Sequence, residues 1–309
     1  MTPPQCSFVE VRGRRLEVER IVGDPARPTL VFLHEGLGSV SLWKDFPASV
    51  AEATGCPAVV YSRYGYGNSD LLQAPFAVDY MHREALETLP ELLAALGVAE
   101  PVLVGHSDGA SIALIHAGRA GARSRGPACG DATAEVRVAP ADLSGAPSPA
   151  PGSHLRPPGV GTAPPSAGAG NRLRGLALLA PHVFVEDISV QSIAEARVAF
   201  ETTDLPEKLA RHHADPRRTF YGWNDIWLHP DFRAWNIEGF LPSIGCPVLA
   251  IQGHDDEYGT MAQIEAIAAR VGGSCELVKL EACGHSPHRD QPERTLAAIA
   301  RFVAQVAAA

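Results

Sequence analysis

The feature that most constrains the fold is a serine with a glycine two residues away on each side, in the segment Val-Leu-Val-Gly-His-Ser-Asp-Gly-Ala at 102–110. The apolar residues before Ser107 predict a short buried strand, and those after it predict a packed helix. A serine at the tip of a tight strand-to-helix turn has a strained backbone, and only very small side chains fit two residues to either side. Gly105 and Gly109 meet that demand. The segment therefore predicts a nucleophile elbow above the positive end of a helix.

Strands and helices alternate along the rest of the chain. Two short strands at 8–10 and 15–19 predict an antiparallel hairpin at the edge of a sheet. Further buried strands are predicted at 29–33, 58–61, 175–179, 247–253 and 276–280, with helical patterns at 43–53, 80–96, 260–271 and 291–306. This alternation predicts an α/β fold with a mostly parallel central sheet and helices on both faces.

Two segments interrupt the alternation. Proline, glycine and serine make up nearly half of residues 120–171, and such a segment cannot bury enough apolar area to offset its ordering entropy. We therefore expect a disordered insertion there. Residues 183–241 form a helical excursion that holds three of the four tryptophans. These tryptophans either pack the excursion onto the core or, for some of them, line a pocket for an apolar or aromatic acyl group.

Composition excludes several classes of function. The formal net charge of −9 argues against nucleic acid or an anionic membrane as a partner. The N-terminus has no basic region followed by an apolar core, and no stretch of about eighteen apolar residues occurs. We therefore expect neither an export signal nor a membrane span, and the cytoplasm as the location. The six cysteines form no Cys-X-X-Cys pair, so we expect no metal site and no other cofactor.

The order of the chemistry-bearing residues resembles that of the α/β-hydrolase superfamily. Ser107 is followed by an acid after a late strand and by Gly284-His285 after the last strand. The turn His34-Glu35-Gly36 and the glycine-punctuated loop at 62–69 agree in order and context. The likeness covers nearly the whole chain outside the predicted insertion.

The resemblance implies an α/β-hydrolase fold with a helical cap. The cap would be the excursion at 183–241, between a first core part at 1–182 and a second core part at 242–309. In that position it would cover the site and set the choice of substrate.

The resemblance also implies the catalytic roles. Ser107 would be the nucleophile, His285 the general base, and Asp256 the acid that orients the imidazole. The family pattern after this strand is glycine, two residues and aspartate, which the segment Gly253-His254-Asp255-Asp256 fits. Asp255 is the alternative acid, because a shift of one residue in the loop cannot be settled from the sequence.

The oxyanion hole would use the backbone N–H of Asp108 and one N–H from the turn after the first long strand. Glu35 stands where the family generally has glycine, so the second donor is either Gly36 or Leu37. A carboxylate that faces a developing oxyanion is unfavourable. Glu35 is therefore expected to point outward in a structural role or, less favoured, to bind a polar group of the substrate.

These residues point to a serine hydrolase that cleaves a small carboxylic ester or thioester through an acyl-enzyme. Glu35, Trp223 and Trp227 are the candidate substrate contacts. In the superfamily that the chain resembles, dehalogenases and epoxide hydrolases use aspartate at the nucleophile position, so the serine argues against both activities. The first alternative is a carbon–carbon bond hydrolase of aromatic ring-fission products. Such an enzyme needs a polar side chain that binds an acidic dienoate, and no arginine of the cap can be assigned that role from the sequence. The second is a non-catalytic ligand receptor on the same fold. The partner expected is a small-molecule substrate, and the sequence says nothing of oligomeric state.

Overall fold

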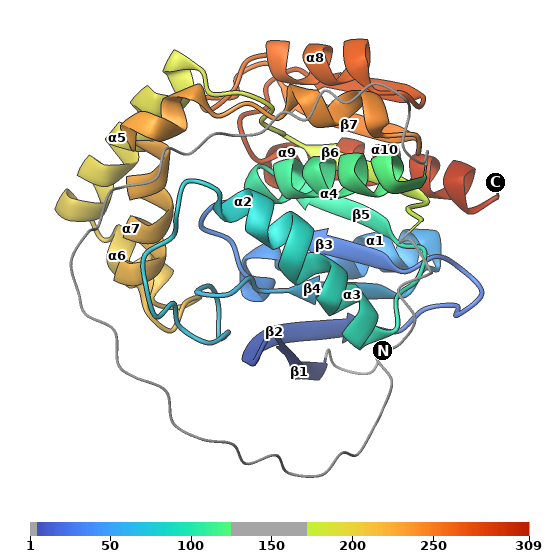
Figure 1. Cartoon of the computed structure of the whole chain (residues 1–309), viewed down its shortest axis with the longest axis horizontal. Coiled ribbons are helices and arrows are strands. Elements are labelled where there is room, and N and C mark those ends of the chain that lie inside the picture. Colours follow the sequence, from blue (N-terminus) through green and yellow to red (C-terminus); the bar gives the residue numbers. More distant parts are fainter. Residues whose placement is uncertain (1–4, 125–171, 309) are drawn as a thin grey trace, which may run out of the picture.

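A single mixed sheet forms the centre of the molecule (Figure 1). The computed structural model describes residues 5–124 and 172–308, and there the eight strands have the order β1-β2-β4-β3-β5-β6-β7-β8. Their bounds are β1 Gln5–Val11, β2 Arg14–Ile21, β3 Leu30–Leu33, β4 Ala58–Tyr61, β5 Val102–His106, β6 Gly175–Leu179, β7 Val248–Gly253 and β8 Cys275–Leu280. β1 and β2 form an antiparallel hairpin at one edge, and all pairings from β4 to β8 are parallel. The predicted edge hairpin and parallel sheet are confirmed.

Helices cover both faces of this sheet. They are α1 Phe46–Thr54, α2 Tyr80–Arg83, α3 Leu89–Leu96, α4 Asp108–Ser124, α8 Ala262–Arg270, α9 Pro287–Asp290 and α10 Pro292–Ala307, with a 3-10 helix η1 Val40–Trp43. Successive side chains of a strand point to opposite faces. In β3, Val31 and Leu33 pack with the core of α3, α4 and α8, whereas Leu30 and Phe32 pack with the core of α1 and α10.

The helix predicted over 80–96 is continuous but not uniform. A π-helical stretch, η2 Glu84–Thr88, separates α2 from α3. Pro90 follows at the start of α3 and lacks the N–H that would bond the carbonyl four residues earlier, so the regular ladder is interrupted there. The stretch buries the Glu84 side chain, whose Oε1 accepts a hydrogen bond of 2.8 Å from the hydroxyl of Tyr61.

Between β6 and β7 the chain forms the predicted helical excursion. Its helices are α5 Asp187–Thr202, α6 Leu205–Leu209, α7 Pro216–Trp227, and the 3-10 helices η3 Pro230–Ala234 and η4 Glu238–Ser243. α5, α6 and α7 contact one another and group on one side of the sheet (Figure 1), whereas η4 packs against α4 of the core. We call this excursion, residues 183–241, the cap. The predicted insertion at 120–171 begins inside α4, and its remainder lies outside the described residues.

Candidate active site

Ser107 occupies the strained turn that its flanking glycines predict. Its φ is 52°, a left-handed backbone conformation that residues other than glycine rarely adopt. Its N–H donates to the carbonyl of Leu179, 2.9 Å away, which ties the elbow to β6. A Cβ on Gly105 would lie 2.6 Å from Ala110 Cα, and one on Gly109 would lie 2.1 Å from the carbonyl oxygen of Leu33. The second contact involves β3, so three segments meet at this turn.

That close approach gives a stability prediction. Gly109→Ala should lower the free energy of unfolding by at least about 2 kcal/mol, because the new methyl group meets backbone rather than a movable side chain. Chemical denaturation followed by circular dichroism measures the change. Gly239→Ala is the matched control: nothing lies within 4 Å of a Cβ placed on Gly239, so its effect should stay within about 0.5 kcal/mol. Equal stability of the two variants would contradict this account of the elbow.

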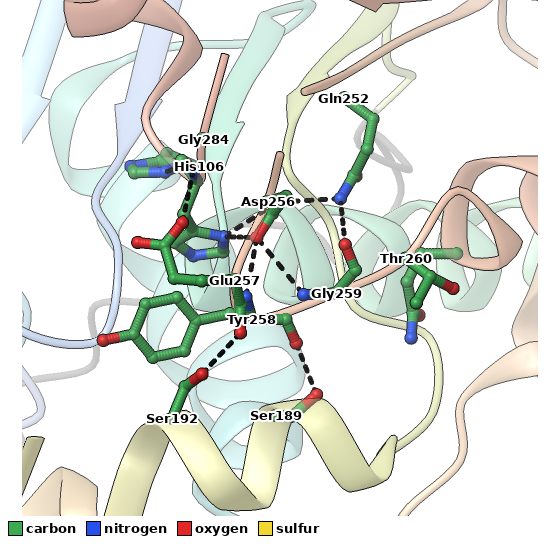
Figure 2. Close-up of polar contacts among 12 residues, drawn as sticks. His106, Ser189, Ser192, Gln252, Asp256, Glu257, Tyr258, Gly259, Thr260 and Gly284 are labelled. Carbon is green, nitrogen blue, oxygen red and sulfur yellow. Dashed lines mark hydrogen bonds and ion pairs between the residues drawn. The ribbon is translucent and has the colours of Figure 1, made fainter. Parts of the chain in front are cut away.

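Asp256 and His285 form a hydrogen-bonded pair. His285 Nδ1 lies 2.9 Å from Asp256 Oδ1 and 3.0 Å from Oδ2. The carboxylate also accepts bonds from the backbone N–H groups of Tyr258 and Gly259 and from the side-chain amide of Gln252. Figure 2 shows Asp256 held between Gln252 and these loop residues. Because a carboxylate only accepts, Nδ1 carries the proton and Nε2 keeps a free lone pair.

The pair sets the charge state of both groups. Burial alone would raise the pKa of Asp256, but the neighbouring His285 and the donors around the carboxylate outweigh it, and the pKa is lowered. Burial alone would lower the pKa of His285, but the Asp256 carboxylate outweighs it, so that pKa is raised. Asp256 is thus ionised beside an imidazole of increased basicity, as a general base requires.

Among the described residues, no hydrogen bond joins Asp255, the alternative acid, to His285. Asp255 is exposed, and its backbone N–H donates to the carbonyl of Cys283.

Gln252, which the sequence reasoning did not select, donates to Asp256 Oδ2 at 2.7 Å and to the carbonyl of Gly259 at 2.9 Å. The signal for it was present, since Gln252 is a buried polar residue in an otherwise apolar strand, Val-Leu-Ala-Ile-Gln-Gly.

Ser107 and His285 line one cavity of about 240 Å³. No hydrogen bond joins the two side chains in the described residues, and such contacts often tighten only when a substrate binds. His182, after β6, lines the same cavity, and burial lowers its pKa to about 3, so its ring is neutral. No motif in the sequence singles out His182.

Gly36 and Leu37 also line this cavity. They are the central residues of a turn that the N–H of Gly38 closes onto the carbonyl of Glu35 at 3.0 Å. Within residues 5–124 and 172–308 no hydrogen bond engages the backbone N–H of Gly36, Leu37 or Asp108. All three candidate oxyanion donors are therefore available, and Gly36 and Leu37 remain alternatives. The Asp108 side chain is buried and accepts a bond from the Tyr80 hydroxyl.

Glu35 does not point outward, so the orientation favoured from the sequence is wrong. Its side chain lines the cavity, with Oε2 3.4 Å from His106 Nδ1 and Oε1 3.5 Å from Arg289 Nη2. Burial alone would raise the pKa of Glu35, but contact with His106 and the charge of Arg289 bring it well below the usual range. Arg289, distant in sequence, balances the charge of a carboxylate that would otherwise oppose an oxyanion.

The cap supplies the apolar side of the cavity. Trp223 and Trp227 of α7 line it together with Ile193 of α5. Trp235, in contrast, stacks on Phe232 with ring centroids 5.4 Å apart and does not line it. Trp223 and Trp227 thus belong both to the buried core and to the cavity wall, and Trp235 to the core alone.

The cap is also hydrogen-bonded to the loop after β7, which carries Asp256. The hydroxyls of Ser189 and Ser192 on α5 donate to the carbonyls of Tyr258 and Glu257 (Figure 2). Glu257 Oε2 in turn accepts the backbone N–H of His285 at 3.2 Å. Helix α5 is therefore linked through Glu257 to the segment that carries His285.

A larger cavity, of about 800 Å³, lies between the β1–β2 hairpin, the loop at 63–77 and the helical stretch that runs from α2 through η2. Its rim carries Arg12, paired with Glu87 and Glu91, and neither Ser107 nor His285 lines it. The candidate catalytic residues therefore lie at the smaller cavity. In the part of the chain that the structure describes, no group of three His, Cys, Asp or Glu side chains could hold a metal ion. Nor does any helix in that part have the length and apolarity needed to cross a membrane.

Comparison with known proteins places these observations in context. The model of the family described as "Alpha/beta hydrolase family" matches residues 30–298. Among curated proteins, the sn-1-specific diacylglycerol lipase ABHD11 of Mus musculus is 28% identical over 106 residues, which are 34% of this chain and 33% of that protein. The chain thus matches about a third of the length of that relative.

Solved structures share the fold. A bacterial membrane phospholipase A superposes with a TM-score of 0.65 at 19% identity, covering 99% of this chain and 87% of that one. An esterase of Thermogutta terrifontis superposes with a TM-score of 0.62 at 16% identity, covering 98% of this chain and 99% of that one. At such identities the likeness is one of fold.

Proposed function

The chain belongs to the alpha/beta hydrolase family, and on that basis we propose that it is a serine hydrolase that cleaves a small carboxylic ester or thioester through an acyl-enzyme. The observation that carries the proposal is the Asp256–His285 hydrogen bond, which leaves Nε2 of the histidine free in the cavity that Ser107 lines. Names of similar proteins agree with it, since the mouse relative is called a lipase and a solved neighbour an esterase.

The proposed reaction begins with attack of Ser107 Oγ on the substrate carbonyl carbon while His285 Nε2 takes the hydroxyl proton. The resulting oxyanion would accept bonds from the N–H of Asp108 and from one N–H of the turn, that of Gly36 or Leu37. His285 then returns the proton to the departing alcohol or thiol, and the acyl group stays on Ser107. A water molecule, deprotonated by the same histidine, releases the carboxylic acid and restores the serine.

The size and walls of the cavity support a short acyl group. About 240 Å³ is below the range usual for drug-sized ligands, and Trp223, Trp227 and Ile193 give one wall an apolar surface. Arg289 lines the cavity as well, but Glu35 lies 3.5 Å from it and balances its charge. Arg289 therefore does not offer a free positive charge that could bind an acidic dienoate. This favours ester cleavage over carbon–carbon cleavage.

A panel of p-nitrophenyl esters of increasing acyl length tests the proposal. We expect kcat/KM to be highest for short acyl chains and to fall once the chain outgrows the cavity. Trials with an acidic dienoate of the ring-fission type should show no turnover. Turnover of the dienoate without ester cleavage would favour the carbon–carbon hydrolase, and turnover of neither by folded protein would favour a receptor.

A further inference from the structure

The cap reaches the proposed oxyanion turn through one buried histidine. His213, in the loop between α6 and α7, is 5% exposed. Its Nε2 lies 2.9 Å from the carbonyl oxygen of Leu37, and its Nδ1 lies 3.0 Å from the backbone nitrogen of Gly67. The ring therefore joins the turn after β3 to the loop after β4. No motif in the sequence singles out His213.

Both partners of the ring are backbone groups, so its tautomer is determined. The N–H of Gly67 can only donate, which requires an unprotonated Nδ1, and the carbonyl of Leu37 can only accept, which requires a proton on Nε2. The ring is thus neutral, with one fixed orientation. Burial lowers the pKa of His213, which favours the same neutral form. A doubly protonated ring could not accept the bond from Gly67.

This contact fixes the peptide next to the oxyanion donors. The carbonyl of Leu37 and the N–H of Gly38 belong to one peptide group; the carbonyl accepts from His213 and the N–H donates to Glu35 O. Rotation of that group would break both bonds. The free N–H of Leu37 belongs to the preceding peptide, which shares the Cα of Leu37 with the anchored one. The peptide of the Gly36 N–H is held in addition by the carbonyl of Glu35, which accepts from the N–H of Gly38 and from Arg63 Nη2 at 2.9 Å.

A second cap residue limits movement from the other side. A Cβ on Gly36 would lie 2.1 Å from Nε1 of Trp223, so the indole ring of α7 packs directly on the backbone of the turn. Trp223 and His213 belong to the same part of the cap and contact adjacent residues of the turn. The cap therefore contacts the turn at Gly36 and Leu37 as well as lining the cavity.

We propose that His213 is a positioning residue of the oxyanion hole, which holds the turn at Gly36 and Leu37 so that its free N–H is directed at the carbonyl attacked by Ser107. This inference rests on the proposed function and adds to it a requirement placed on the cap. It predicts a loss in kcat without a matching change in KM, because substrate binding does not require the oxyanion contact whereas the transition state does.

The test compares three variants on the best p-nitrophenyl ester. His213→Leu removes donor and acceptor, and kcat should fall about tenfold or more, less than the roughly 10²–10³-fold expected for complete loss of an oxyanion donor. KM should stay within about twofold. His213→Gln offers one acceptor and one donor and should recover part of the loss. His212→Leu is the control, since this neighbouring histidine contacts Ser41 at the surface and kcat should be unchanged.

The outcomes separate this inference from the proposed function. If the wild-type protein cleaves no ester, the proposed function fails. If it does and His213→Leu has unchanged kcat, or Leu and Gln variants lose activity only in parallel with thermal stability, the positioning role is overturned. If His213→Leu does not fold, long-range ¹H–¹⁵N correlation spectra of the wild type decide: the neutral Nε2–H tautomer is expected, and an Nδ1–H tautomer or a charged ring at neutral pH would refute the proposal.

Discussion

Ser107→Ala should reduce kcat/KM for p-nitrophenyl esters by about 10⁴-fold or more, leaving only the rate that substrate binding and the oxyanion donors supply. The reason is the loss of the atom that would form the acyl-enzyme. Alanine adds no atoms to the tight turn at φ 52°, so the variant should fold. Steady-state kinetics measure the change, and thermal unfolding verifies the fold.

Ser49→Ala serves as the control, since Ser49 lies on α1 and its hydroxyl bonds only the carbonyl of Asp45 among the described residues. Its kinetics should match those of the wild-type protein. A Ser107→Ala protein with undiminished turnover would show that the elbow serine is not the nucleophile.

Asp256→Asn should give the second-largest loss, about 10³–10⁴-fold in kcat. An asparagine presents an amide where the carboxylate accepted from His285 and Gln252. Its NH₂ group would face a donor, so the imidazole would be driven to the tautomer that has no free lone pair toward Ser107. Asp255→Asn is the matched control and should change kcat by less than about twofold, because the Asp255 side chain is exposed. Reversed effects would make Asp255 the acid.

The pH profile gives a second measure of the same pair. His285 must be neutral to act as a base, and the Asp256 carboxylate raises its pKa against the effect of burial. Wild-type kcat/KM should therefore fall as pH drops through a pKa above the ordinary histidine value of 6.5, with a plateau at higher pH. Residual activity of Asp256→Asn should show this inflection at lower pH. An inflection that does not move would separate Asp256 from the titrating base.

Local pattern was enough to predict the sheet and the elbow. Gly105 and Gly109 flank the serine for a steric reason that acts within a few residues, and the strands at 175–179 and 58–61 are short apolar runs with clear ends. The pairing of Asp256 with His285 was implied by the resemblance to the α/β-hydrolase superfamily. The sheet explains it, because each residue follows a parallel strand and neighbouring parallel strands deliver such residues to one edge.

Contacts between distant segments could not be predicted in this way. The direction of Glu35 depends on His106 and Arg289, which only the folded chain brings beside it. Likewise, nothing local distinguishes buried His213 from the more exposed His212, because the difference arises from how the cap lies on the turn after β3. The sequence indicates which residues can do chemistry, and long-range packing decides which neighbours tune them.

The most direct test of the central claim is the intact mass of the protein after treatment with a fluorophosphonate, followed by peptide mapping. The account predicts one adduct, located on Ser107 and absent from the Ser107→Ala variant. Folded protein that takes up no label, or an adduct located on another residue, would contradict the assignment of Ser107 as an activated nucleophile.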